Sequence, residues 1–285
     1  MNRLVTSLKN FNELVMFQHS IFSLPFIFIA MIVAADGWFG WYLLFMGALA
    51  AVTARNFAMG LNRYADRDVD VKNPRTASRP SVDGRISPKA ILVFTLVNAI
   101  GFIAVAYFIN ELAFYLSIPI LAVLGSYSYF KRFSALAHII LGISLGLAPI
   151  AGVVAVEAAI PLWSVYLSVG VLFWVAGFDL LYSLQDIEFD KDEGLHSIPS
   201  KFGAKNTFMI AQFFHLLTIA FWALFVVEAD LGLFAMIAVG FSTVMLGYEH
   251  YLVNKDFSKI DRAFFTVNGY LGIIFIIFII LEKVV

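Results

Sequence analysis

The sequence predicts an all-α integral membrane protein, a bundle of nine transmembrane helices around a cavity that faces the cytoplasm. Composition is the first indication. Of the 285 residues, 61% are hydrophobic and only 14% are charged, and the mean hydropathy of +0.87 lies far from that of soluble domains. The second indication is that the apolar segments follow one another almost without interruption. We therefore expect residues 1–285 to form one domain, with two polar functional loops at approximately 62–87 and 186–203.

A helix that crosses a bilayer needs about 20 mostly apolar residues. Nine segments meet or approach that requirement, at approximately 20–35, 39–61, 88–109, 112–130, 134–155, 163–185, 204–227, 231–250 and 263–283. The first is short, and Val33-Ala34-Ala35 before Asp36 offers the small residues of a signal-peptide cleavage site. The region before it is long for a signal peptide, so we expect a retained helix.

Sidedness follows from the basic residues, which accumulate in cytoplasmic loops. With nine spans and an inner N-terminus, every lysine and arginine falls on the inner side except Arg55, within a span, and Lys283. Both polar loops then face the cytoplasm. We expect a bacterial or archaeal cytoplasmic (inner) membrane protein. Within the spans, Gly142 and Gly146 sit four residues apart, as close helix packing requires.

Each polar loop begins with an acidic motif. If the preceding helix continues, with about 100° of turn per residue, the acidic and amide residues of each motif share one face. The first motif, in GLNRYADRDVD, is Asn62, Asp66 and Asp70; the second, in FDLLYSLQDIEFD, is Asp179, Asp186 and Asp190, with Tyr182 nearby on the same helix. Any single aspartate would usually be read as solvating a helix end. Two motifs with the same alignment and sidedness favour a divalent-metal site.

The chemistry of this site follows from which side chains are present and which are absent. The chain has no cysteine, and its histidines lack the i, i+4 pairing of a helical zinc site. Carboxylate oxygens remain, and these suit Mg²⁺. Basic residues accompany both motifs, and arginine binds phosphate through paired hydrogen bonds. They are Arg63 and Arg67 beside the first motif, Arg75 and Arg79 in NPRTASRP, and Lys201 after the second motif. A diphosphate bound through metal fits this combination best, and the absence of a Walker motif argues against ATP.

The two motifs resemble the paired N-x₃-D-x₃-D and D-x₆-D-x₃-D signatures of the UbiA family of intramembrane prenyltransferases. The segment from Tyr127 to Lys131, YSYFK, resembles the Y-x₃-K motif of the same family. The resemblance implies transfer of a polyprenyl group from its diphosphate to an aromatic acid within the bilayer. The acceptor would be 4-hydroxybenzoate or a related hydroxylated aromatic such as a dihydroxynaphthoate, in ubiquinone or menaquinone biosynthesis.

The resemblance also implies roles for individual residues. Asn62, Asp66 and Asp70 would hold one Mg²⁺, and Asp186 and Asp190 another, bridged by the diphosphate. Tyr127 and Lys131 would contact the diphosphate or the departing oxygen. Further substrate contacts are expected from Arg63, Arg67, Arg79, Asp179, Tyr182, Lys201 and His19. For Asp179, assistance in proton removal and a hydrogen bond to a neighbouring helix remain equal alternatives, and for His19 a structural role competes with lining the cavity.

The leading alternative from another functional class is a cation transporter, because intramembrane carboxylates also line ion paths. Transport sites usually lie near the midplane at interrupted helices, whereas these motifs lie at one surface beside arginines that would repel cations. We therefore rank the enzyme first. Its expected partners are a polyprenyl diphosphate, a small aromatic acceptor and the lipid bilayer, and we expect neither nucleic acid nor a protein partner.

Overall fold

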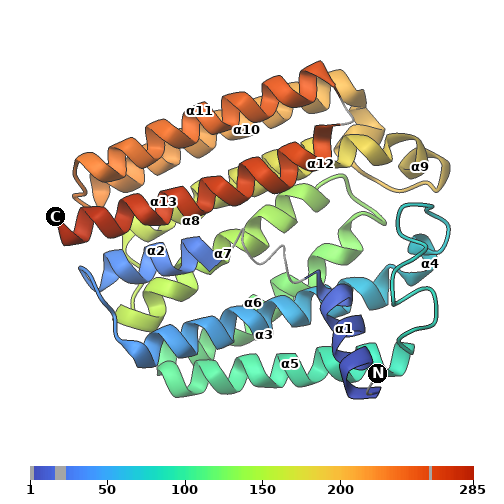
Figure 1. The fold of residues 1–285 in the computed structure, drawn as a ribbon, viewed down its shortest axis with the longest axis horizontal. Coiled ribbons are helices and arrows are strands. Elements are labelled where there is room, and N and C mark those ends of the chain that lie inside the picture. Colours follow the sequence, from blue (N-terminus) through green and yellow to red (C-terminus); the bar gives the residue numbers. More distant parts are fainter. Residues whose placement is uncertain (1–2, 17–23, 257–258) are drawn as a thin grey trace.

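A computed structural model describes residues 3–16, 24–256 and 259–285, which form helices and connecting loops without a strand (Figure 1). The elements in chain order are α1 (Arg3–Val15), α2 (Leu24–Ala34), α3 (Trp41–Ala65), α4 (Arg67–Asp70), α5 (Pro88–Ile109), α6 (Glu111–Phe130), α7 (Ala137–Glu157), α8 (Leu162–Tyr182), a 3₁₀ turn (Ser183–Asp186), α9 (Ile187–Asp192), α10 (Ile198–Glu228), α11 (Leu233–Lys255), α12 (Ile260–Arg262), a π-helical segment (Ala263–Val267) and α13 (Asn268–Val284). The predicted all-α fold is confirmed.

Eight helices among the described residues are long and apolar enough to cross a membrane. They correspond to the predicted spans from 39–61 to 263–283. The predicted first span at 20–35 overlaps α2, which has 11 described residues and is short for a span. Part of that span lies outside the described residues, so a total of nine spans stays a prediction.

Local sequence sets the ends of several helices. Ser87 caps α5 by accepting a hydrogen bond from the Ala90 amide, and Pro88 follows at the first helical position. Ser197 and Ser200 form a reciprocal capping box at the start of α10. α10 is interrupted at Gly203, whose φ of 76° and ψ of 167° are not helical, so a short capped turn precedes the long unbroken part of the helix, which starts at the predicted residue 204.

The helices form a closed arrangement around the cavity. α3 packs against α5 and α6, α6 packs against α7, and α7 packs against both α2 and α8. The series continues through α10, α11 and α13 and returns to α2 (Figure 1). Segments distant in sequence thus become neighbours. This circular order places residues of α2, α3, α5, α6, α7 and α8 around one chamber.

Close packing of α7 and α8 depends on two glycines, as predicted. A Cβ atom on Gly142 would lie 2.4 Å from the carbonyl oxygen of Leu172, and one on Gly146 would lie 2.9 Å from that of Ser168. Both distances are too short for any larger side chain without movement of the helices. The glycines therefore set the separation between α7 and α8.

Large aromatic side chains fill the core between α2, α8, α10 and α13. Phe26 stacks on Trp222 with ring centroids 5.3 Å apart and lies 5.1 Å from Trp174. Trp222 and Phe275 make an edge contact at 5.1 Å. All four side chains are fully buried. This cluster gives the wall of the chamber a rigid backing.

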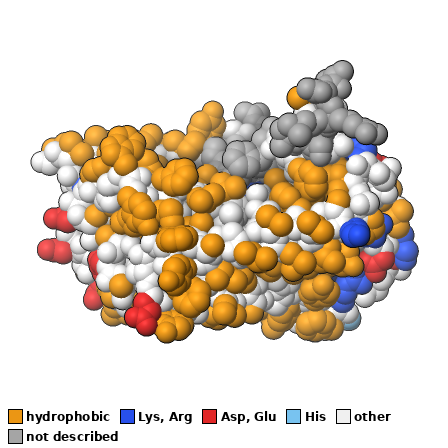
Figure 2. All heavy atoms as spheres, turned by 90° about the horizontal axis from the view of Figure 1, so that it is seen from below, with side chains coloured by type: hydrophobic (Ala, Val, Ile, Leu, Met, Phe, Trp, Pro, Cys, Tyr) orange, Lys and Arg blue, Asp and Glu red, His pale blue; other side chains and the backbone are white. Residues whose placement is uncertain are grey.

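The outer surface matches a bilayer environment. Hydrophobic side chains cover the middle of the face in Figure 2, whereas charged side chains gather at the two ends. Lysines and arginines gather at the end where Figure 1 places α4 and α9, together with acidic groups. The charge asymmetry expected from the sequence is therefore present in the folded chain, and the two acidic motifs lie at its basic end.

Candidate active site

The first acidic motif lies where α3 leaves the bundle. α3 ends at Ala65, and α4 begins at Arg67. Two main-chain hydrogen bonds bridge this break, from the Asp66 amide to the Asn62 carbonyl at 2.9 Å and from the Asp70 amide to the Asp66 carbonyl at 2.7 Å. The helical spacing therefore persists, and the three side chains share one face. Asn62 Nδ2 donates to Asp66 Oδ2 at 2.8 Å.

The second acidic motif starts within α8 and ends beyond it. α8 stops at Tyr182, and the 3₁₀ turn Ser183–Asp186 precedes α9. α8 therefore does not continue to Asp190, so the condition under which the three aspartates would share one face is not met. A 3₁₀ turn takes about three residues per turn rather than about 3.6, so the carboxylates do not keep the common line that an unbroken helix would give them. Asp179 instead contacts His138 of α7 at 2.7 Å.

Two cationic side chains pair with the carboxylates of the first motif. Lys131 Nζ lies 2.7 Å from Asp66 Oδ2. Arg79 Nη1 donates to both oxygens of Asp70 at 2.8 Å. Both aspartates are almost completely buried, and a buried carboxylate requires such compensation. The paired charges keep the motif in place at the mouth of the bundle.

Arg75 joins the first polar loop to the second motif. Its Nη2 and Nε donate to the two carboxylate oxygens of Asp186, at 2.6 and 3.2 Å, and its Nη1 donates to the Tyr182 hydroxyl at 3.1 Å. Asn73 Nδ2 donates to Asp186 Oδ1 at 3.4 Å. The loop after the first motif therefore folds across onto the second. From the sequence, Arg75 was noted only as part of NPRTASRP, because spacing does not show which arginine of the loop contacts the second motif.

The oxygen donors of this region fit a hard divalent cation. Asp66 Oδ1 is buried without a hydrogen-bond partner among the described residues. Burial raises the pKa of Asp66 above its ordinary value, and Lys131 offsets this only in part. A cation at this oxygen would compensate for the burial. Within the described part of the chain, no three acidic or histidine side chains are grouped closely enough to hold a metal alone. Mg²⁺ is usually held by one or two carboxylates together with phosphate oxygens and water.

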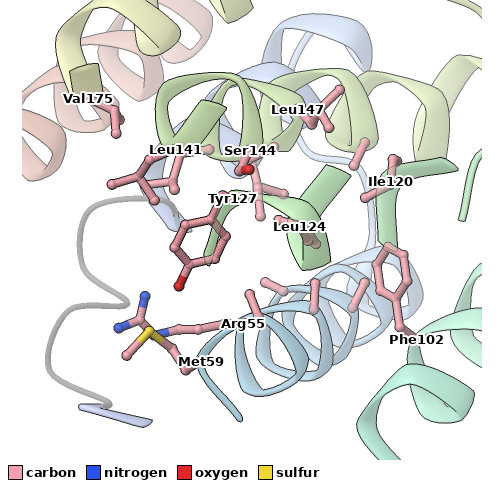
Figure 3. A pocket seen from close by; sticks show the side chains of 18 of the residues that line it. Arg55, Met59, Phe102, Ile120, Leu124, Tyr127, Leu141, Ser144, Leu147 and Val175 are labelled. Carbon is pink, nitrogen blue, oxygen red and sulfur yellow. The ribbon is translucent and has the colours of Figure 1, made fainter. Parts of the chain in front are cut away.

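A cavity of about 360 Å³ extends from this region into the bundle. α3 lines it from Asn62 back to Gly47, about 22 Å of helix. Polar side chains occupy one end, whereas apolar ones such as Phe102, Ile120 and Leu124 line the depth (Figure 3). The cavity therefore has a charged mouth and a long oily interior.

Two arginines of α3 border the cavity and also hold the C-terminal end of α1. Arg55 Nη2 donates to the carbonyls of Met16 and Val15 at 3.0 and 3.4 Å. Arg63 Nε donates to the Leu14 carbonyl at 3.2 Å. Both arginines line the cavity. Arg63 was predicted as a substrate contact, whereas Arg55 was noted only as lying within a span. The position of Arg55 within a predicted span could have identified it as a functional residue, because a charge inside the membrane is costly and usually functional.

Tyr127 of the Y-x₃-K segment also lines the cavity, where Figure 3 shows its hydroxyl directed toward the Arg55 guanidinium. Lys131, one turn further along, pairs with Asp66 at the mouth. Tyr127 therefore lines the cavity itself, whereas Lys131, the residue after α6, reaches the acidic motif at the mouth. Among the described residues, Tyr182 and Asp179 border the cavity as well.

Three predicted substrate contacts are not placed at the cavity. Arg67 Nε donates to the Ser81 carbonyl at 3.0 Å and so braces the loop. Lys201 is exposed, with its ammonium 5.4 Å from the Phe202 ring centroid. Neither residue lines the cavity. His19 lies outside the described residues. Arg67 lies in α4 and Lys201 in the first turn of α10, and spacing along the chain does not encode how these short segments are oriented.

Comparison with known sequences gives the family. The UbiA prenyltransferase family matches residues 23–278 of this chain. A 4-hydroxybenzoate octaprenyltransferase from Herminiimonas arsenicoxydans is 31% identical over 245 residues, which cover 85% of each chain. One from Saccharophagus degradans is 29% identical over 257 residues, covering 89% of this chain and 84% of that one.

Solved structures agree. A UbiA homolog from Aeropyrum pernix K1, in its apo form, superposes with a TM-score of 0.85 at 31% identity, over 93% of this chain and 98% of that one. A homolog from Archaeoglobus fulgidus bound to GPP and Mg²⁺ gives 0.77 at 21% identity, over 97% of this chain and 100% of that one. Fold and site thus define a membrane-embedded prenyltransferase. The chain belongs to the UbiA prenyltransferase family.

Proposed function

We propose that this enzyme transfers a polyprenyl group from a polyprenyl diphosphate to an aromatic acid, using Mg²⁺, as a step of ubiquinone or menaquinone biosynthesis. 4-Hydroxybenzoate is the first candidate acceptor, because the curated relatives are named for it, and a dihydroxynaphthoate is the second. One observation carries the proposal: a single cavity joins a charged mouth to an apolar chamber inside the bundle. That shape and polarity match a ligand with a diphosphate head and a hydrocarbon tail.

The diphosphate head would lie between the two acidic motifs. Arg75 and Arg79 would turn from their carboxylate partners to the phosphate oxygens, with the paired geometry that guanidinium groups allow. Lys131 and Tyr127 would add a cation and a hydroxyl donor at the leaving oxygen. The residues that would hold Mg²⁺ are Asn62, Asp66 and Asp70 on one side and Asp186 and Asp190 on the other. When bound, Mg²⁺ supplies positive charge that stabilises the departing diphosphate.

The prenyl tail would occupy the apolar depth of the cavity, past Leu124 and Ile120. Ionisation of the allylic C–O bond produces a cation that water would capture, so an apolar wall that excludes water protects the reaction. The acceptor carboxylate would bind Arg55, whose buried Nε has no partner among the described residues. The acceptor ring would then lie between Arg55 and the mouth. Catalysis then rests on positioning and on charge stabilisation at the leaving group.

We place the enzyme in the bacterial or archaeal cytoplasmic membrane with both acidic motifs at the cytoplasmic face. The support for this orientation is the gathering of lysines and arginines at the end that carries α4 and α9 (Figure 2), because such residues accumulate on the inner side. Both substrates would then reach the mouth from the cytoplasm or the inner leaflet.

The test is an assay of the purified protein in detergent with geranyl diphosphate, Mg²⁺ and a panel of aromatic acids. The panel holds 4-hydroxybenzoate, a dihydroxynaphthoate and, as a control, benzoate without a hydroxyl group. We expect a prenylated product from at least one hydroxylated acid, and none from benzoate or without Mg²⁺. The absence of product across the panel, or cation flux in liposomes in its place, would overturn the proposal.

A further inference from the structure

One contact at the cavity has no part in binding the diphosphate. His138 of α7 and Asp179 of α8 face one another, with Nδ1 and Oδ2 2.7 Å apart. His138 is 6% exposed, and its Nε2 is buried with no partner among the described residues. Asp179 borders the cavity. His138 therefore contacts one carboxylate oxygen of Asp179 and restrains its position.

Asp179 differs from every other side chain that lines the cavity. In the described part of the chain, it carries the only carboxylate on the cavity wall, where the other ionisable groups are arginines and tyrosines. Asp66, Asp70 and Asp186 already have cationic partners at the mouth. Asp179 is paired with a histidine instead.

Asp179 and Arg55 lie at comparable distances from the mouth along their segments. Asp179 precedes Asp186 by seven residues, and Arg55 precedes Asn62 by seven. The interval in α3 corresponds to about 10 Å, and the interval from Asp179 through the 3₁₀ turn corresponds to about 12 Å. Because Asn62 and Asp186 both belong to the mouth, Arg55 and Asp179 stand at a similar level inside the cavity. An acceptor whose carboxylate binds Arg55 would present its ring to Asp179.

We propose that Asp179 is the proton acceptor of the prenyl transfer and that His138 is its positioning residue; the inference rests on the function proposed above. The allylic C–O bond breaks, and its electron pair leaves with the diphosphate. A pair of ring π electrons forms the new C–C bond at the carbon beside the hydroxyl group. The C–H pair of that carbon restores the aromatic ring, and its proton passes to the carboxylate of Asp179. Water at the open mouth takes the proton after product release.

In this arrangement His138 donates from Nδ1 to Asp179 Oδ2. The bond orients the carboxylate so that its second oxygen is available to the cavity, and no partner for that oxygen is found among the described residues. A histidine that orients a carboxylate in this way preserves its geometry in a largely apolar surrounding. Asparagine at this position would retain a donor, whereas leucine would not.

The experiment compares four variants of the full-length protein with the wild type: Asp179→Asn, His138→Leu, His138→Asn and the control His196→Asn. His196 is exposed, and no side-chain contact of this residue is found in the described structure. The substrates are geranyl diphosphate and whichever acceptor of the panel is active, unlabelled or deuterated at the ring carbons beside the hydroxyl group. The measurements are kcat, KM for each substrate, release of geraniol and the isotope effect on product formation.

We expect Asp179→Asn to lower kcat for the prenylated product by about 10²-fold or more, the range of a lost general base. KM for geranyl diphosphate should stay near the wild-type value, and geraniol should appear as water captures the cation. Loss of the ring proton should become rate-limiting, so a primary isotope effect should appear in the variant. His138→Leu should lower kcat by about 10-fold to 100-fold, as other orienting residues do, with partial recovery in His138→Asn.

The outcomes separate this inference from the function on which it rests. If the wild type prenylates no acceptor, the proposed function itself fails. If the wild type is active but Asp179→Asn keeps its rate and shows no isotope effect, the proton-transfer role is wrong while the function stands. Equal losses in His138→Leu and His138→Asn, without an isotope effect, would assign His138 to packing alone. Binding of geranyl diphosphate to each variant shows that it is folded.

Discussion

The contact between α7 and α8 allows a sharp test, because Gly142 has no room for a side chain. A Cβ atom there would lie 2.4 Å from the Leu172 carbonyl oxygen and 3.2 Å from the Ala176 Cβ. Ordinary contact begins at 3.4 Å, so Gly142→Ala requires the two helices to separate by about 1 Å at this point. Overpacking of this kind typically costs about 1–3 kcal/mol.

Gly240 provides the matched control. It also lies within a helix, but a Cβ atom there would have nothing within 4 Å. Gly240→Ala should therefore be neutral or stabilise α11 by up to about 1 kcal/mol, because alanine favours helix more than glycine does. The two substitutions are chemically identical and differ only in their surroundings.

The assay is the thermal unfolding midpoint of each variant in one detergent, followed by prenyl transfer at a temperature where both are folded. We expect Gly142→Ala to unfold at a lower temperature than Gly240→Ala. It should also turn over more slowly, because His138, one turn away on the same helix, would move from Asp179. Equal midpoints for the two variants would refute the packing argument, and normal turnover in a destabilised Gly142→Ala would separate the helix contact from catalysis.

Three further predictions concern the charged groups. Asp66→Asn and Asp186→Asn should each lower turnover by about 10²-fold or more in the prenyl-transfer assay, because each removes a carboxylate that would hold the Mg²⁺ that stabilises the leaving group. Size-exclusion profiles should stay unchanged, and wild-type rates would contradict the metal assignment. Chelation with EDTA should abolish product formation and added Mg²⁺ should restore it, and activity in excess EDTA would refute metal dependence. Arg55→Leu should raise KM for a carboxylated acceptor by about 10-fold to 100-fold, the worth of a charged hydrogen bond of about 1.5–3 kcal/mol; KM for geranyl diphosphate should not change, and an equal rise in both would contradict the acceptor role.

Much of the fold could be predicted because hydropathy and helix length are local properties. The eight long helices correspond to predicted spans, and the long part of α10 starts after the break at Gly203, where the span was predicted to begin. The packing role of Gly142 was predictable as well, since small residues four apart on a membrane helix indicate close approach. In each of these cases, the information lies within a few residues of the feature.

The parts that could not be predicted depend on contacts between distant segments. The partnership of Arg75 with Asp186 requires the first polar loop to fold across the bundle, and nothing near Arg75 in sequence distinguishes it from Arg79. The interruption of α8 after Tyr182 takes Asp186 and Asp190 off the predicted line, and the packing of α7 against α8 gives Asp179 its partner His138. Arg55 was recognisable in the sequence as an unusual residue, because a charged side chain within a membrane span is energetically costly. Only the structure shows that it faces the cavity.

The attachment of Arg55 to the end of α1 has a thermodynamic consequence. A free arginine side chain gives up about 2 kcal/mol of rotamer entropy when it is immobilised. Here two main-chain carbonyls already restrict the guanidinium before any substrate arrives. An incoming anion therefore meets a preorganised donor and loses little affinity to ordering. A change that detaches α1 from Arg55 would let the arginine side chain rotate freely again. It would thereby weaken substrate binding without any substitution of a residue that lines the chamber.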